Sequence, residues 1–151
     1  MIRGALRFIG PAAAVGAGIA IVTHHAAAQA SRYTITGGTV YDVKTKLTWA
    51  QAVSPQTTSQ AGAAAYCSSL SLNGAADWRL PTMKELVTIE DFSAPSPPLI
   101  DAVAFPATPS AYFWTVTPCT SAANTAWYVD FREGVSSCGA IAGSFWVRCV
   151  R

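Results

Sequence analysis

Alternating apolar and polar positions predict a β-hairpin soon after residue 30. A short β-prone run at residues 33–36 is interrupted by Gly37-Gly38. Residues 39–42 and 47–50 then predict two strand segments around a Lys-Thr-Lys turn, with Trp49 packed inward. The pattern therefore places a hairpin at the start of the folded region.

A second β-rich region begins at residue 112. Residues 113–117 are aromatic or β-branched, and residues 126–132 and 145–151 alternate in polarity, so each segment predicts a strand. Glu133-Gly134 predicts a turn between the last two. The alternation places one set of side chains, Trp127, Val129 and Phe131, opposite another, Tyr128, Asp130 and Arg132. We expect three of the tryptophans, Trp114, Trp127 and Trp146, to belong to the core.

Two helices are predicted between these regions. Residues 59–70 are rich in alanine, and Ala63, Tyr66, Cys67 and Leu70 recur at helical spacing on one face. A second, shorter helix is predicted from Met83 to about Glu90. Residues 93–111 hold five prolines and predict a long irregular connection, which is a plausible place for a binding surface. The element order predicts an α+β fold with two helices packed on one side of a twisted antiparallel sheet.

The start of the second helix has a strong local signature. Thr82 and Glu85 form a T-x-x-E capping box directly after Pro81, and Trp78 and Arg79 precede it. A buried indole and a paired guanidinium usually hold a fold together. We therefore interpret these four side chains as a structural motif, with ligand contact as the alternative.

Residues 1–30 have the pattern of an export signal. Arg3 and Arg7 precede an apolar run at residues 8–22, and Ala28-Gln29-Ala30 matches a cleavage site, so cleavage after Ala30 is expected. The run is short for a membrane span, so none is expected after cleavage. The sequence thus predicts one domain at residues 31–151, located in the periplasm, on the cell surface or outside the cell.

Cleavage changes the charge and the available chemistry. Ten Lys and Arg less the two in the signal leaves eight, against eight Asp and Glu, so the processed chain has no net formal charge. Nucleic-acid binding through bulk charge is therefore not expected. Both histidines, His24 and His25, leave with the signal. Histidine-dependent triads, dyads and metal sites are excluded from the processed chain.

Four cysteines remain, and an even number in an exported chain predicts two disulfides. Three pairings are possible. Cys67 lies on the apolar helix face and Cys149 shares a predicted strand face with Val147, which favours a nested arrangement in which Cys119 and Cys138 form the inner bridge. The spacing lacks the C-x2-C pairs of a zinc site, so no metal or other cofactor is expected.

In this order and spacing, the motifs resemble the Lcl C-terminal domain family over nearly all of residues 31–151. The segments that carry the resemblance are Thr39-Val40-Tyr41-Asp42, Leu47-Thr48-Trp49, Ala65-Tyr66-Cys67, Asp77-Trp78-Arg79-Leu80-Pro81-Thr82, Phe113-Trp114-Thr115, Ala126-Trp127, Val129-Asp130-Phe131 and Val147-Arg148-Cys149-Val150-Arg151. The resemblance implies a C-type-lectin-like fold in exported or surface bacterial proteins. In founding members the domain is similar to an adhesin head that binds sulfated polysaccharides. This chain lacks the calcium motif of sugar-binding C-type lectins, and its neutral charge does not match a sulfated ligand.

The favoured function is a non-catalytic binding module for a glycan or a protein. Candidate ligand contacts are aromatic and charged side chains expected on the loop side: Tyr112, Tyr128, Asp130, Arg132 and Glu133. A structural or assembly component of the bacterial envelope is the alternative. An enzyme is less favoured, because Glu85 is committed to the capping box and the adjacent Glu90 and Asp91 point in different directions.

Overall fold

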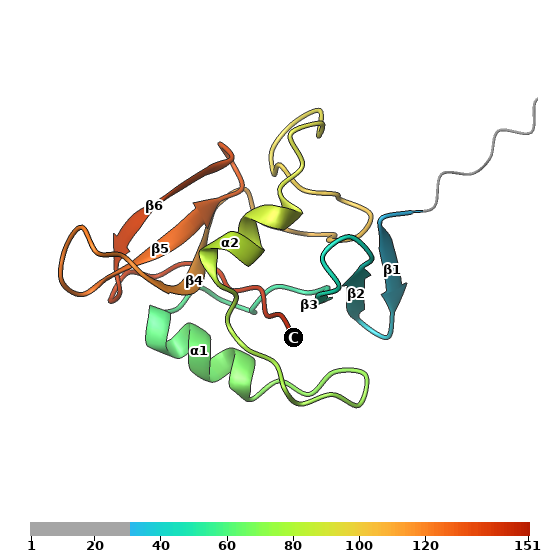
Figure 1. Cartoon of the computed structure of the whole chain (residues 1–151), viewed down its shortest axis with the longest axis horizontal. Helices are drawn as coiled ribbons and strands as arrows, with labels where there is room; N and C mark the ends of the chain where they lie inside the picture. The colour runs from blue at the N-terminus through green and yellow to red at the C-terminus, as the bar shows by residue number, and fades with distance from the viewer. Residues whose placement is uncertain (1–30) are drawn as a thin grey trace, which may run out of the picture.

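The computed structural model describes residues 31–151, so the expected export signal and its cleavage point lie outside the described residues. Two three-stranded antiparallel sheets lie at opposite ends of the molecule (Figure 1). The first contains β1 (Tyr33–Thr36), β2 (Thr39–Asp42) and β3 (Thr48–Ala50), and the second contains β4 (Tyr112–Pro118), β5 (Thr125–Asp130) and β6 (Val135–Ala140). The α+β class is confirmed, but two small sheets replace the single sheet that was expected.

The turn at Gly37-Gly38 determines how β1 pairs with β2 in the first sheet. Gly37 and Gly38 both have positive φ, of 56° and 77°, which glycine adopts without the steric cost of a Cβ. The turn pairs Thr36 with Thr39, and the register continues to Tyr33 opposite Asp42. The expected hairpin of β2 and β3 is also present, with Val40 opposite Trp49, and residues 33–36 add a third strand to it.

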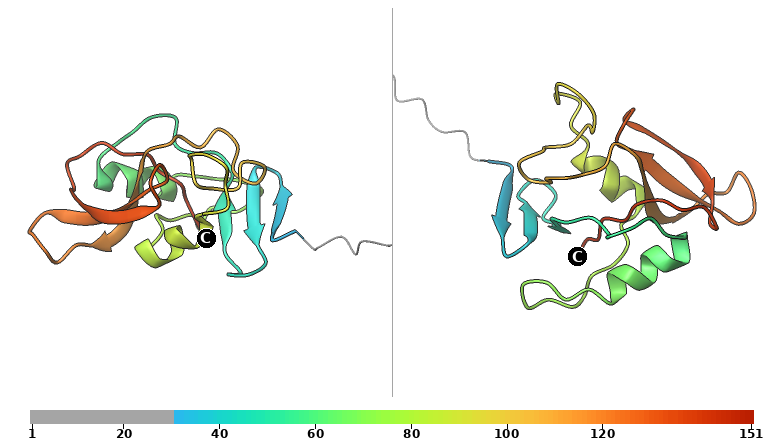
Figure 2. Two further views of the ribbon diagram at one scale, coloured as in Figure 1. Left: turned by 90° about the horizontal axis from the view of Figure 1, so that it is seen from above. Right: turned by 180° about the vertical axis from the view of Figure 1, so that it is seen from behind.

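The helices are short. Helix α1 (Gln60–Ser68) is capped at its N-terminus by Ser59, whose hydroxyl accepts a hydrogen bond from the Gly62 amide. Helix α2 (Met83–Leu86) continues into a 3-10 turn, η1 (Val87–Ile89), where one long helix was expected. Views from above and behind place α2 between the two sheets and α1 beside the C-terminal segment (Figure 2). Among residues 31–151, no helix has the length and apolar character that crossing a bilayer requires.

The prediction of a last strand at residues 145–151 is wrong. This segment makes isolated bridges instead, from Phe145 to Thr58, from Trp146 to Phe113, and from Val150 to both Trp49 and Arg79. It runs between the two sheets, and residues 147–150 are all buried, so alternation did not mark one inner and one outer face. The third strand of this sheet is β6, which pairs with β5 on the side away from β4 and was not predicted because its sequence, Val-Ser-Ser-Cys-Gly-Ala, has little apolar content.

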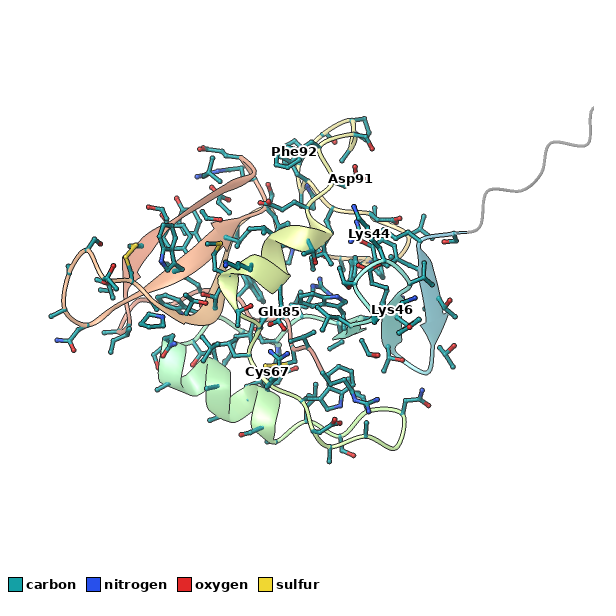
Figure 3. The ribbon with its side chains drawn as sticks, viewed as in Figure 1. Lys44, Lys46, Cys67, Glu85, Asp91 and Phe92 are labelled. Atoms are coloured by element: carbon teal, nitrogen blue, oxygen red, sulfur yellow. A yellow bond between two sulfur atoms is a disulfide. The ribbon has the colours of Figure 1, made fainter. Side chains whose placement is uncertain are left out.

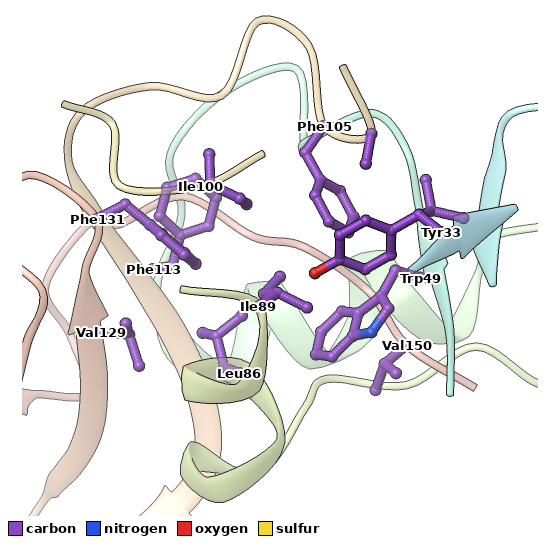
Figure 4. Close-up of a cluster of buried hydrophobic side chains, with 12 residues drawn as sticks. Tyr33, Trp49, Leu86, Ile89, Ile100, Phe105, Phe113, Val129, Phe131 and Val150 are labelled. Carbon is purple, nitrogen blue, oxygen red and sulfur yellow. The ribbon is translucent and has the colours of Figure 1, made fainter. Parts of the chain in front are cut away.

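Two groups of buried side chains form the core. The first joins the sheets through Leu86 and Ile89, which lie between Trp49 of β3 and Phe113 of β4 (Figure 4). The second surrounds Trp78 and Trp114 beside α1. Trp114 is fully buried as expected, and Trp146 is half-buried and packs against the first group, whereas Trp127 is half-buried and belongs to neither group. A half-buried indole remains available to a ligand.

Both disulfides form between the expected partners. Cys67 of α1 bonds to Cys149 in the C-terminal segment, across 82 positions of sequence, and Cys119 bonds to Cys138 of β6, across 19. The first bridge therefore ties α1 to the segment that runs between the sheets, and the second closes the β4–β5–β6 sheet at one end.

Candidate binding surface

The motif at residues 78–85 is held together by hydrogen bonds among its own residues. The Thr82 hydroxyl accepts from the Glu85 amide at 3.2 Å, and Glu85 Oε2 accepts from the Thr82 amide at 2.8 Å, which confirms the capping box. Arg79 donates to both carboxylate oxygens of Glu85, at 2.9 and 2.7 Å. Trp78 is buried and donates its indole N–H to the Ala75 carbonyl at 3.0 Å. These polar groups bind one another, so the structural interpretation accounts for them.

The Arg79 fork and the Thr82 hydrogen bonds lower the pKa of Glu85 to about 2. A depressed folded-state pKa gives stability that is present above the unfolded pKa and is lost as pH falls from about 4.5 toward 2. We expect Glu85→Gln to cost about 1–2 kcal/mol near pH 7, a value reduced for partial exposure. Urea unfolding at several pH values should show this difference shrinking as the pH falls through that window. Parallel wild-type and variant curves between pH 6 and 3 would contradict the assignment.

The structure gathers the predicted ligand residues at one end of β4 and β5. The rings of Tyr112 and Tyr128 lie 4.8 Å apart between centroids, and Phe145 lies within 5.3 Å of both. Gly139 of β6 permits this packing, because a Cβ there would come within 3.0 Å of Phe145 and 3.2 Å of Tyr128. All three rings are half-buried, so their outer edges reach solvent.

The charged members of the predicted set pair with one another. Arg132 donates to the Tyr112 hydroxyl and to Asp130 Oδ2, both at 3.1 Å, and forms an ion pair with Glu133 at 3.3 Å. The hydrogen bond to Tyr112, followed by the nearby carboxylates, raises the pKa of Arg132. Asp130 is almost fully buried, so it supports Arg132 and offers little surface. Ligand binding by these five residues stays a prediction, and the only cation among them, Arg132, already pairs with both carboxylates of the group.

A hollow that sequence reasoning missed lies between residues 51–55 and residues 106–109. We call it the Trp146 hollow, because the half-buried indole of Trp146 forms part of its wall, and its volume is about 500 Å³. Its lining is Gln51, Ala52, Val53, Ser54, Pro55, Pro106, Ala107, Pro109 and Trp146. The only sequence signal was the proline-rich connection, which supplies one wall.

A second hollow adjoins the first. The Tyr66 hollow lies between α1 and residues 54–58, has a volume of about 350 Å³, and shares Ser54 and Pro55 with the Trp146 hollow. Its lining is Ser54, Pro55, Gln56, Thr58, Gly62, Ala65, Tyr66 and Ser69. Gly62 lets the helix approach Thr58, since a Cβ at that position would meet the Thr58 hydroxyl oxygen at 2.2 Å. We refer to the two together as the paired hollows.

Arg148 joins the two walls of the Trp146 hollow from below. Its Nη1 donates to the carbonyls of Ala50 and Gln51 at 2.9 and 2.5 Å, and its Nη2 donates to the Thr108 hydroxyl at 2.6 Å. The guanidinium also lies over the Phe105 ring, 4.7 Å from its centroid. Burial lowers the pKa of Arg148 to about 9, so the group remains charged at neutral pH. The alternating pattern of residues 145–151 places Arg148 on the face opposite Val147 and Cys149 and gives no sign of these partners.

The adjacent carboxylates Glu90 and Asp91 have pKa values shifted in opposite directions. Burial raises the pKa of Glu90, whereas hydrogen bonds from the Ser93 side chain and amide lower that of Asp91. Within residues 31–151, no group of three or more His, Cys, Asp or Glu is placed to hold a metal ion. Every cysteine of this region is in a disulfide.

Comparison with known proteins supports the resemblance noted in the sequence. No curated protein matches the chain. The sequence model of the family described as "Lcl C-terminal domain" matches residues 38–151. These residues include every strand except β1, both helices and all four cysteines. The match covers well over half of the 151 residues, and the chain therefore belongs to the Lcl C-terminal domain family.

Proposed function

We propose that this chain is an exported, non-catalytic binding module with a C-type-lectin-like fold, and that its ligand is a glycan or a protein. The observation that carries the proposal is the pair of adjoining hollows, with volumes of about 500 and 350 Å³. Volumes of this size fall within the range of small-ligand sites. Their linings hold aromatic, hydroxyl and amide side chains and no ionisable acid or base other than Tyr66, which suits recognition better than proton transfer.

The hollows are supported from beneath, which favours binding without a large rearrangement. Arg148 fixes the backbone at residues 50–51 relative to Thr108, and the Cys67–Cys149 bridge fixes α1 relative to Arg148's own segment. A site held in its binding shape loses less conformational freedom when a ligand arrives. Long ordered connections such as residues 93–111 are also uncommon unless they serve a function.

The two disulfides are the basis for proposing that the chain is exported. Two disulfides in one small domain form and persist in oxidising compartments, which favours the periplasm, the cell surface or the extracellular space. The balanced charge of residues 31–151 gives no reason to propose nucleic acid as a partner.

Two variants separate the two candidate binding faces. We expect Trp146→Ala to lower ligand affinity at least tenfold and Arg132→Ala to change it less than threefold, measured on a ligand found by a glycan array or by periplasmic pull-down. Circular dichroism should show that both variants are folded. The reverse order of effects would move the site to the Tyr112–Tyr128 cluster, and blank arrays together with an empty pull-down would remove the binding-module proposal.

A role in envelope assembly is the second candidate, supported by a different surface. Phe92 is 69% exposed and Val103 is 80% exposed, and Phe92 lies beside Asp91 on the outer loop of the molecule (Figure 3). Exposed apolar side chains of this size are typical of protein contacts when they form a patch. In-cell crosslinking should then capture a partner through wild-type chain but not through Phe92→Ser. Identical crosslinks from both proteins would tell against this candidate.

A further inference from the structure

We infer that the paired hollows take a chain of uncharged sugars, and that sulfated or carboxylated glycans are not their ligands. The inference rests on the proposed function and adds the ligand class and the site. It starts from the shared wall, Ser54 and Pro55, which places the two hollows next to each other. A ligand that fills both must extend past this wall, which favours several linked units over a single small molecule.

Charge decides which glycans fit. The lining residues of both hollows include no Lys, Arg, Asp or Glu. Arg148 lies beneath the Trp146 hollow, but it has no exposed surface and is bound to protein carbonyls, so an anionic ligand cannot contact it. A sulfate or carboxylate placed here would lose hydration without gaining a cationic partner.

The Lys and Arg side chains elsewhere on the domain do not line the paired hollows, and several of them form ion pairs. Arg32, Arg79 and Arg151 form ion pairs with Asp42, Glu85 and Asp77. Lys44 and Lys46 lie on the turn between β2 and β3, which lines neither hollow (Figure 3). The features that bind polyanions, which are clustered and unpaired Lys and Arg, are therefore missing from the paired hollows.

The lining matches the two kinds of surface that a sugar presents. Trp146 in one hollow and Tyr66 in the other are half-buried aromatic residues, which can pack against the apolar face of a sugar ring. Gln56 and Thr58 bring an amide and a hydroxyl that can exchange hydrogen bonds with sugar hydroxyls. Gln51 adds an amide oxygen as acceptor, while its Nε2 donates to the Ala104 carbonyl at 3.3 Å. One aromatic residue in each hollow, with polar groups around it, gives each hollow the chemistry of a sugar subsite.

The test is a glycan array that holds neutral, carboxylated and sulfated glycans at matched lengths, probed with residues 31–151 of the wild type. We expect binding only to neutral glycans, and a dissociation constant for the best of them that changes less than twofold between 50 and 500 mM NaCl. Binding that is confined to sulfated or carboxylated glycans and weakens with salt would overturn the inference while leaving the binding-module proposal in place. A protein ligand captured by pull-down, with no neutral glycan bound, would do the same.

Variants locate the site on the neutral glycan that the array selects. Trp146→Ala and Tyr66→Ala should each weaken binding at least tenfold. Because loss of an aromatic can disturb packing, Ala52→Glu offers a second approach: this exposed residue lines the Trp146 hollow, and a longer charged side chain there should also weaken binding tenfold. Ala122→Glu, at an exposed position between β4 and β5, is the matched control and should bind like the wild type. If Trp146→Ala, Tyr66→Ala and Ala52→Glu all bind the glycan as tightly as the Ala122→Glu control, the placement of the ligand in the paired hollows is overturned.

Discussion

Removing the Cys67–Cys149 disulfide with the double variant Cys67→Ala/Cys149→Ala is expected to lower the free energy of unfolding by about 4–5 kcal/mol, before any native strain is subtracted. The bridge closes a loop across 82 positions, so without it the unfolded chain gains much conformational freedom. Both sulfurs are buried in the core group beside α1, and alanine leaves no unpaired polar group there. Urea unfolding followed by tryptophan fluorescence measures the change.

The second disulfide provides the comparison. Cys119→Ala/Cys138→Ala opens a loop across only 19 positions and should cost about 3 kcal/mol. The order of the two effects matters more than their absolute size, because strain and residual structure shift both. A larger loss from the short bridge than from the long one would contradict the view that the long bridge organises the domain.

Trp114→Ala is expected to destabilise the domain by about 3–5 kcal/mol, because it leaves a cavity at a fully buried position. The indole N–H also donates to the Thr58 carbonyl at 2.8 Å, and the indole lies 4.3 Å from the Phe145 ring between centroids. Trp114 therefore holds the segment before α1 against β4. Trp114→Phe keeps most of the ring and should cost about 1–2 kcal/mol through the lost hydrogen bond and volume. Similar urea midpoints for the alanine variant and the wild type would contradict this placement.

Local features of the fold could be predicted because a few neighbouring residues determine them. The capping box needs only Thr82 and Glu85 three positions apart, and the β2–β3 hairpin needs only two β-prone segments on either side of a short Lys-Thr-Lys turn. The start of the first helix needs only a Ser cap before an alanine-rich segment with one apolar face. In each case, the chemistry of a short segment decides the outcome.

Features that depend on distant neighbours could not be predicted. Residues 147–150 are buried because α1, β3 and the loop at residues 105–108 surround them, so alternation there does not separate a core face from a solvent face. Arg148 is the clearest case: its partners Ala50 and Thr108 are 98 and 40 positions away. The β6 strand depends on pairing with β5 more than on its own composition.

One part of the candidate site could be predicted from the sequence, and the other part could not. Tyr112 and Tyr128 could be placed together from the strand pattern, because they lie on paired strands with the same facing. The paired hollows could not, since their walls come from residues 51–58, from α1 and from residues 106–109, which meet only in the folded chain. Trp146 packs against the core as expected, but the hollow that its half-buried side chain also lines could not be predicted from the sequence.

The central claim is that this domain recognises its ligand through a preformed, uncharged surface between α1 and the proline-rich loop. The most direct test is a nuclear magnetic resonance titration of residues 31–151 with a neutral glycan selected on the array, following the indole N–H signals and the backbone amides. The account predicts that the largest shifts occur at the Trp146 indole and at the amides of Ser54 and Tyr66, with little change at Arg132 or Phe92. Shifts confined to Arg132 and its neighbours, or to the loop around Phe92, would contradict it.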